Sequence, residues 1–118
     1  MKIYISGPIT GTDDYMERFE AAEKMLTEAG LSVVNPAKVN AQLPKETTYT
    51  EYMDMSVTML HMCDAVYFLR GWENSRGSTV EFEEAYTKKK AILFEGVNVA
   101  WLTSKHENVS STENPASE

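Results

Sequence analysis

The chain has 118 residues, of which 42% are hydrophobic and 25% are charged, a balance typical of one soluble globular domain. Its 18 acidic and 11 basic residues give a net charge of -7, which argues against long nucleic acid as a partner, because that affinity comes from basic side chains. The single cysteine excludes an internal disulfide. Because the sequence has no apolar run of membrane length and no signal-peptide pattern, we expect a cytoplasmic protein.

The first part of the chain alternates between strand and helix patterns. Residues 2–5 (KIYI) form a β-rich run, and the turn residues of SGPITG follow. A helix is predicted over 13–29, because apolar residues recur at steps of three and four, and Gly30 ends it. This stripe consists of Tyr15, Phe19, Ala22, Leu26 and Ala29. Residues 31–35 (LSVVN) form the second predicted strand.

The middle of the chain predicts a loop, a helix and a third strand. Residues 37–48 are polar and contain a proline, which favours a loop. Thr48 and Glu51 have the spacing of a capping box and predict a helix that continues to about residue 62. We interpret one face of this helix as packing surface: Tyr52, Met55, Met59 and Met62. The apolar run 65–69 (AVYFL) suits a strand covered on both sides.

The last part begins with the loop GWENSRGS and a helix predicted over 78–90, with three lysines at its negative C-terminal end. Residues 91–94 (AILF) are a fourth strand, and 97–102 (VNVAWL) are a candidate fifth strand. The remaining residues are almost all polar, so we expect one domain over 1–102 and a flexible tail over 103–118.

The alternation of strands and helices predicts an α/β fold. We expect a flavodoxin- or Rossmann-like three-layer structure with a four- or five-stranded parallel sheet in the order 2-1-3-4-5. Ligands of such sheets bind outside the carboxyl ends of the strands. Since strands 1 and 3 are neighbours in this order, the loops SGPITG and GWENSRGS should face each other across one crevice.

Several residues at this crevice could carry chemistry. Glu81 is expected in the first turn of the third long helix, where a carboxylate either stabilises the helix dipole or reacts with a ligand. Before it, a hydroxyl, a guanidinium and a flexible backbone suit a phosphate, although such residues also form ordinary polar turns. The candidate binding residues are Ser75, Arg76 and Gly77 here, and Ser6, Gly7, Ile9 and Gly11 in the first loop. Tyr4 is either a core aromatic or reaches the crevice with its hydroxyl.

Two segments resemble the nucleoside 2-deoxyribosyltransferase-like superfamily. The pattern Ser75-x-Gly77-x-x-x-Glu81-x-x-x-Ala85 is similar to the signature of these transferases and of the related 2′-deoxynucleoside 5′-monophosphate N-hydrolases. IYISGPITG is similar to their first strand and loop. The chain resembles most a branch of small domains that share ISGPITG, CDAVYFL, GWE-SRG and the motif glutamate. The resemblance covers residues 2–95.

The resemblance implies a glutamate nucleophile and a reaction without metal or organic cofactor. Glu81 would attack C1′ of a (deoxy)ribosyl group, with Tyr4 and Asp54 as further catalytic residues, and the helix N-terminus would keep Glu81 ionised. Ser75 matches the hydrolases, whose serine holds the 5′-phosphate, whereas the transferases tend to carry aspartate. The relatives' helical aspartate lies about eight residues before the third strand. Here Asp54 lies ten residues before Asp64, and Ser56 occupies the ungapped position.

The expected function is therefore an N-glycosidase that cleaves the N-glycosidic bond of a (deoxy)nucleoside 5′-monophosphate. The alternatives are a nucleoside 2-deoxyribosyltransferase that exchanges bases and a nucleotide-binding module without catalysis. We expect a small-molecule nucleoside or nucleotide as the partner, and neither long nucleic acid nor a membrane. Because the methionine-rich helix is more apolar than one core contact requires, and superfamily relatives form homo-oligomers, a homodimer or larger homo-oligomer is also expected.

Overall fold

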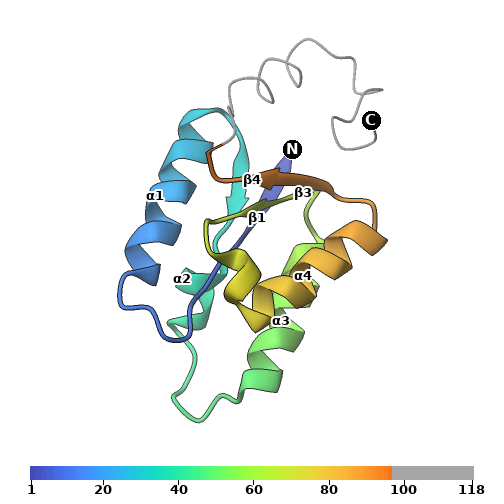
Figure 1. Cartoon of the computed structure of the whole chain (residues 1–118). Helices are drawn as coiled ribbons and strands as arrows, with labels where there is room; N and C mark the ends of the chain where they lie inside the picture. The colour runs from blue at the N-terminus through green and yellow to red at the C-terminus, as the bar shows by residue number, and fades with distance from the viewer. Residues whose placement is uncertain (97–118) are drawn as a thin grey trace.

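The structure, a computed structural model, describes residues 1–96 of the chain. These residues form a four-stranded parallel sheet in the order β2-β1-β3-β4, with helices on both faces (Figure 1). The strands are β1 (Lys2–Ser6), β2 (Ser32–Val34), β3 (Ala65–Phe68) and β4 (Ala91–Phe94). The predicted three-layer α/β fold and the neighbouring first and third strands are confirmed. The candidate fifth strand and the predicted tail lie outside the described residues.

One face of the sheet is covered by α1 (Tyr15–Glu28). The predicted stripe of this helix is confirmed, since Phe19, Ala22 and Leu26 are buried. They pack against residues of β1 and β3 that point to the same side of the sheet: Ile3, Ile5, Ala65 and Tyr67. Each large apolar side chain buried here contributes about 1.5–3 kcal/mol. This face is therefore an ordinary hydrophobic core.

The opposite face is covered by α3 (Tyr49–His61) and α4 (Arg76–Thr87), as Figure 1 shows. Successive side chains of a strand point to opposite faces, so Tyr4 and Ser6 of β1 both point to this side. Tyr4 packs in a second core with Val66, Phe68, Leu60, Cys63 and Ala85. The alternation along β1 thus directs two hydroxyl groups toward α3 and α4.

The capping box of α3 is confirmed: Glu51 N donates to Thr48 Oγ1 at 3.1 Å, and Thr48 N donates to Glu51 Oε1 at 2.8 Å. The interpretation of its methionine face as packing surface holds only in part, because Met59 packs against the second core but two other methionines of the face do not. The buried residues of α3 are Ser56 and Leu60, whereas the methionines at positions 55 and 62 are 36% and 57% exposed. The inward-facing residue Ser56 is small and leaves space for a cavity beside the helix.

The predicted loop over 37–48 is wrong in its first part, which forms the short helix α2 (Pro36–Asn40). The Asn35 side chain caps it, since Oδ1 accepts hydrogen bonds from Ala37 N and Lys38 N. Asparagine followed by proline is a typical helix start. The helix α2 lies between α1 and α3 and contacts both.

The helix α4 begins at Arg76, after the short 3-10 helix η1 (Trp72–Asn74), and not at residue 78 as predicted. Ser75 is its N-cap and accepts a hydrogen bond from Ser78 N. Glu81 therefore lies in the second turn, and the expectation of a first-turn position is wrong. The predicted C-terminal lysines begin at the C-cap, because the helix already ends at Thr87. No helix within residues 1–96 is long and apolar enough to cross a membrane.

Candidate active site

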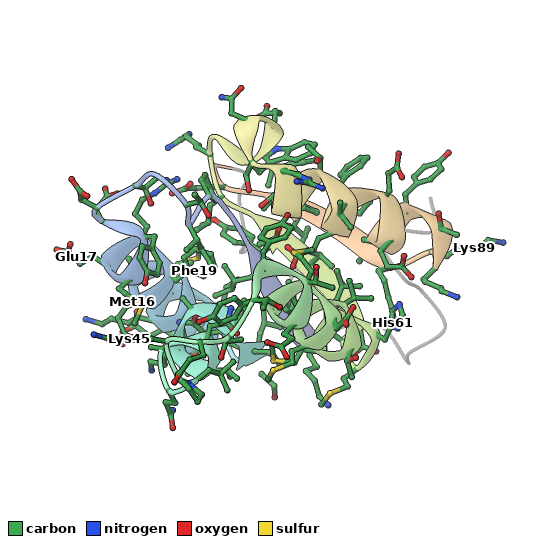
Figure 2. The ribbon with its side chains drawn as sticks, turned by 90° about the horizontal axis from the view of Figure 1, so that it is seen from below. Met16, Glu17, Phe19, Lys45, His61 and Lys89 are labelled. Carbon is green, nitrogen blue, oxygen red and sulfur yellow. The ribbon has the colours of Figure 1, made fainter. Side chains whose placement is uncertain are left out.

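A cavity of about 730 Å³ opens beside the C-terminal end of β1 and is walled by α1, α2, α3 and the start of α4. Both glycine-containing loops line it, as the sheet order predicted. The candidate residues that line it are Tyr4, Ser6, Gly7, Ile9, Ser75, Arg76, Gly77 and Glu81. Figure 2 shows two further lining residues, Phe19 and Lys45, on the α1 side, whereas His61 and Lys89 lie at the opposite end of the molecule.

The Glu81 carboxylate is buried in this cavity, with the residue only 6% exposed. The Tyr4 hydroxyl donates to Glu81 Oε2 at 2.7 Å, and the Ser6 hydroxyl donates to Oε1 at 2.5 Å. Both donors come from β1, at alternate positions on the same face. Each carboxylate oxygen therefore has a hydroxyl partner, which fixes the plane of the carboxylate.

The environment of Glu81 holds its proton more tightly than water would. Burial raises the pKa of Glu81 to about 7, although the hydrogen bonds from Ser6 and Tyr4 lower it. The expectation that a helix N-terminus keeps this carboxylate ionised is wrong, because Glu81 lies one turn too late and is desolvated. Both protonation states are populated near neutral pH. Burial and the Glu81 charge also raise the pKa of Tyr4 well above its usual value, so Tyr4 stays a hydrogen-bond donor.

The first turn of α4 forms a second polar part of the cavity. The Ser75 hydroxyl accepts the cap hydrogen bond and keeps its own proton free to donate to a ligand. The Arg76 guanidinium lies over the ring of Tyr49, at the start of α3, 5.3 Å from the ring centre. A Cβ at Gly77 would lie 3.2 Å from Met53 Sδ, so glycine allows α3 and α4 to approach closely. The Ser75 cap takes the Ser78 N–H, and the N–H groups before it, which have no carbonyl partner within the helix, suit an anion.

The first loop contributes less than expected. A Cβ at Gly7 would lie 2.8 Å from Leu69 Cδ1, so the glycine allows close contact between this loop and the end of β3. Gly11 does not line the cavity. Its φ of +82° accounts for the glycine, because such a left-handed turn suits few other residues. The expected binding role of Gly11 is not supported by its position.

Asp54 is exposed and does not line the cavity, whereas Ser56 is buried and does. Two positions along a helix differ by roughly 200° in direction, so both side chains cannot face the same cavity. The expectation that Asp54 takes part in catalysis is therefore not supported. The position eight residues before Asp64, taken by a serine here, is the one that faces the site.

Several lining residues were not anticipated from the sequence, and three of them are polar residues of interest for the site. Ser78 is buried, with its Oγ 3.0 Å from Ser6 Oγ. Lys45 follows the short helix α2. Asn40 carries a buried Oδ1 without a hydrogen-bond partner among residues 1–96. The helix-start signal at Asn35-Pro36 could have indicated that this segment is ordered. Within the same residues no group of three or more His, Cys, Asp or Glu side chains could hold a metal ion.

The chain is similar to one sequence family and to solved structures of two enzymes. The profile of a family described as a domain of unknown function, DUF4406, matches residues 1–94. The 2-deoxyribosyltransferase of Bacillus psychrosaccharolyticus superposes with a TM-score of 0.65 at 14% identity, over 94% of this chain and 93% of that one. The CMP N-glycosidase BcmB of Clostridium botulinum gives 0.51 at 21% identity, over 93% and 83%. No curated protein sequence matches. The similarity to the two solved structures establishes a shared fold.

Proposed function

Because the chain belongs to the DUF4406 family and has the fold of a 2-deoxyribosyltransferase, we propose that it is an N-glycosidase acting on a (deoxy)nucleoside 5′-monophosphate. One observation carries the proposal. The buried carboxylate of Glu81, held by two hydroxyls, shares a cavity with Ser75, Arg76 and Gly77 at the start of α4. A nucleophile and an anion site in one cavity fit a phosphorylated sugar.

In the proposed reaction a carboxylate oxygen of Glu81 attacks C1′ of the sugar. A C1′–O bond forms while the C1′–N bond breaks, and the electron pair of the broken bond goes to the base, which takes up a proton. Water then attacks C1′, forms a new C1′–O bond, loses a proton and releases the Glu81 carboxylate. The products are the free base and the sugar 5′-phosphate. Tyr4 remains protonated throughout and orients the carboxylate.

The phosphate would bind at the first turn of α4. The Ser75 hydroxyl, the Arg76 guanidinium and the backbone N–H groups supply neutral and charged donors at one place. A charge-assisted hydrogen bond contributes about 1.5–3 kcal/mol, which corresponds to about one to two orders of magnitude in affinity. This arrangement favours a 5′-monophosphate over the free nucleoside.

The similar solved structures support the same class of chemistry. One is a 2-deoxyribosyltransferase and the other is an N-glycosidase of CMP, which is a nucleoside 5′-monophosphate. Base exchange is the second candidate, because the transferase is similar over nearly its whole length. In that reaction a second base takes the place of water at C1′. The serine at position 75 favours hydrolysis.

The test is a panel of nucleosides, deoxynucleosides and their 5′-monophosphates incubated with the full chain, with free base measured by chromatography. Each substrate is also incubated with a second base. Base release that disappears in Glu81→Gln and persists in Glu83→Gln, an exposed carboxylate of the same helix, supports the proposal. Products that appear only with the second base identify a transferase. Binding by calorimetry without any product identifies a nucleotide-binding module.

A further inference from the structure

We propose that Ser78 is a positioning residue that acts through Ser6 on the Glu81 carboxylate. Its catalytic consequence rests on the proposed N-glycosidase function, whereas its effect on the carboxyl group can be measured without a substrate. Position 78 lies between the residues of the motif that indicated the superfamily, so the motif assigns it no role.

The three side chains form one buried chain of hydrogen bonds. Ser78 Oγ lies 3.0 Å from Ser6 Oγ, and Ser6 Oγ lies 2.5 Å from Glu81 Oε1. The exposed fractions are 2% for Ser78, 1% for Ser6 and 6% for Glu81. Ser78 and Glu81 are separated by three positions on α4 and therefore lie on the same side of the helix, facing the end of β1.

The direction of the hydrogen bonds follows from the number of protons. A serine hydroxyl has one proton and can accept on its oxygen. The ionised Glu81 carboxylate can only accept hydrogen bonds, so the single O–H of Ser6 donates to it. The contact between the serines then requires the Ser78 hydroxyl to donate to Ser6 Oγ. Without Ser78 the oxygen of Ser6 loses a hydrogen-bond donor at a buried position. Its hydroxyl then rotates more freely and holds Glu81 less firmly.

The expected effect is on the ionisation of the carboxyl group. The hydrogen bond from Ser6 opposes the effect of burial on the pKa of Glu81, so weakening it should raise that pKa further. Tyr4 is the titratable group in direct contact with Glu81. The other titratable or charged groups that line the cavity are Tyr15, Lys45, Tyr49, Tyr52 and Arg76. Those groups are unchanged by a substitution at position 78.

The test compares wild type with Ser78→Ala, Ser78→Thr and Thr58→Ala. Thr58 is the matched control, because its hydroxyl also forms a hydrogen bond from a helix but lies on the exposed side of α3. The first readout is the pKa of Glu81 from a carbon-13 carboxyl titration by NMR. We expect Ser78→Ala to raise it above the wild-type value, which is about 7. We expect Ser78→Thr, which keeps the hydroxyl, to stay closer to wild type, and Thr58→Ala not to change it.

The second readout is the pH dependence of kcat/KM for base release. In Ser78→Ala its acid limb should move upward with the pKa of Glu81, which lowers kcat/KM about threefold at pH 6 and changes KM less than twofold. In a Ser6→Ala background the Ser78→Ala substitution should have no further effect on the pKa.

Two failures are distinguishable. An unchanged pKa of Glu81 in Ser78→Ala, or an equal change in the Ser6→Ala background, overturns the positioning role whatever the enzyme does. A raised pKa in a protein that releases base from no substrate of the panel supports the positioning role and overturns the proposed function. If Ser78→Ala does not fold, Ser78→Cys, which fills the same space but donates only a weak hydrogen bond, provides the same comparison.

Discussion

The hydroxyl of Tyr4 on β1 donates to Oε2 of Glu81 on α4 over 2.7 Å, and so joins two residues 77 positions apart in the chain. A buried carboxylate without partners is costly, because desolvation disfavours its charge. Tyr4 and Ser6 supply the two partners because the end of β1 passes beneath the second turn of α4. This contact is what turns a helix carboxylate into a candidate nucleophile.

We expect Glu81→Gln to lower the rate of base release by at least about a thousandfold, because an amide oxygen cannot form the glycosyl-enzyme intermediate. Ligand affinity should change little, since the amide keeps the size of the side chain. Base release by chromatography and binding by calorimetry measure the two effects separately. Turnover close to wild type in this variant would show that Glu81 is not the nucleophile.

The raised pKa of Glu81 predicts a pH dependence of stability. The folded state binds this proton more tightly than the unfolded state, so its contribution to stability is complete below pH 4.5 and is lost as the pH rises through about 7. The difference between 4.5 and about 7 corresponds to roughly 3 kcal/mol. We therefore expect wild type to lose stability relative to Glu81→Gln between pH 4.5 and 8. Urea unfolding of both proteins across this range tests it, and parallel pH curves would contradict it.

The anion site predicts a preference for phosphorylated substrates. We expect Arg76→Gln to raise KM for a 5′-monophosphate about 10- to 100-fold and to leave the free nucleoside nearly unaffected, because only the phosphate uses the charge. The matched control is Lys89→Gln, which removes a positive charge far from the cavity, as Figure 2 shows. If Arg76→Gln weakens both substrates equally, the guanidinium does not bind the phosphate.

The exposed apolar side chains of α3 and of its C-cap Met62 predict self-association. Tyr49, Met55 and Met62 are 46%, 36% and 57% exposed. Apolar surface of this kind often marks an interface, and we expect at least a dimer with α3 in the contact. Light scattering at micromolar concentration should give at least twice the chain mass of 13.3 kDa, and Met62→Glu should lower it. A wild-type mass near 13.3 kDa excludes the dimer.

Local patterns in the sequence predicted most elements of this protein and the place of its candidate site. The spacing of Thr48 and Glu51 predicted the start of α3, and the apolar stripe of α1 predicted its buried face. The order of parallel strands then placed the two loops at one edge of the sheet. These predictions hold because capping and side-chain periodicity depend on residues a few positions apart.

Only the tertiary structure decided which side chains enter the cavity and in what chemical state. On α3 the packing turns Ser56 inward and leaves Asp54 in solvent. The sequence alone was compatible with either residue facing the site. The tertiary structure buried Glu81 and raised its pKa, where the helix position alone favoured a lower one. The hydroxyls of Ser6 and Ser78, which are 72 positions apart in the chain, form a hydrogen bond. Burial and long-range hydrogen bonds set these properties, and both depend on how separate elements pack, which no local pattern of residues records.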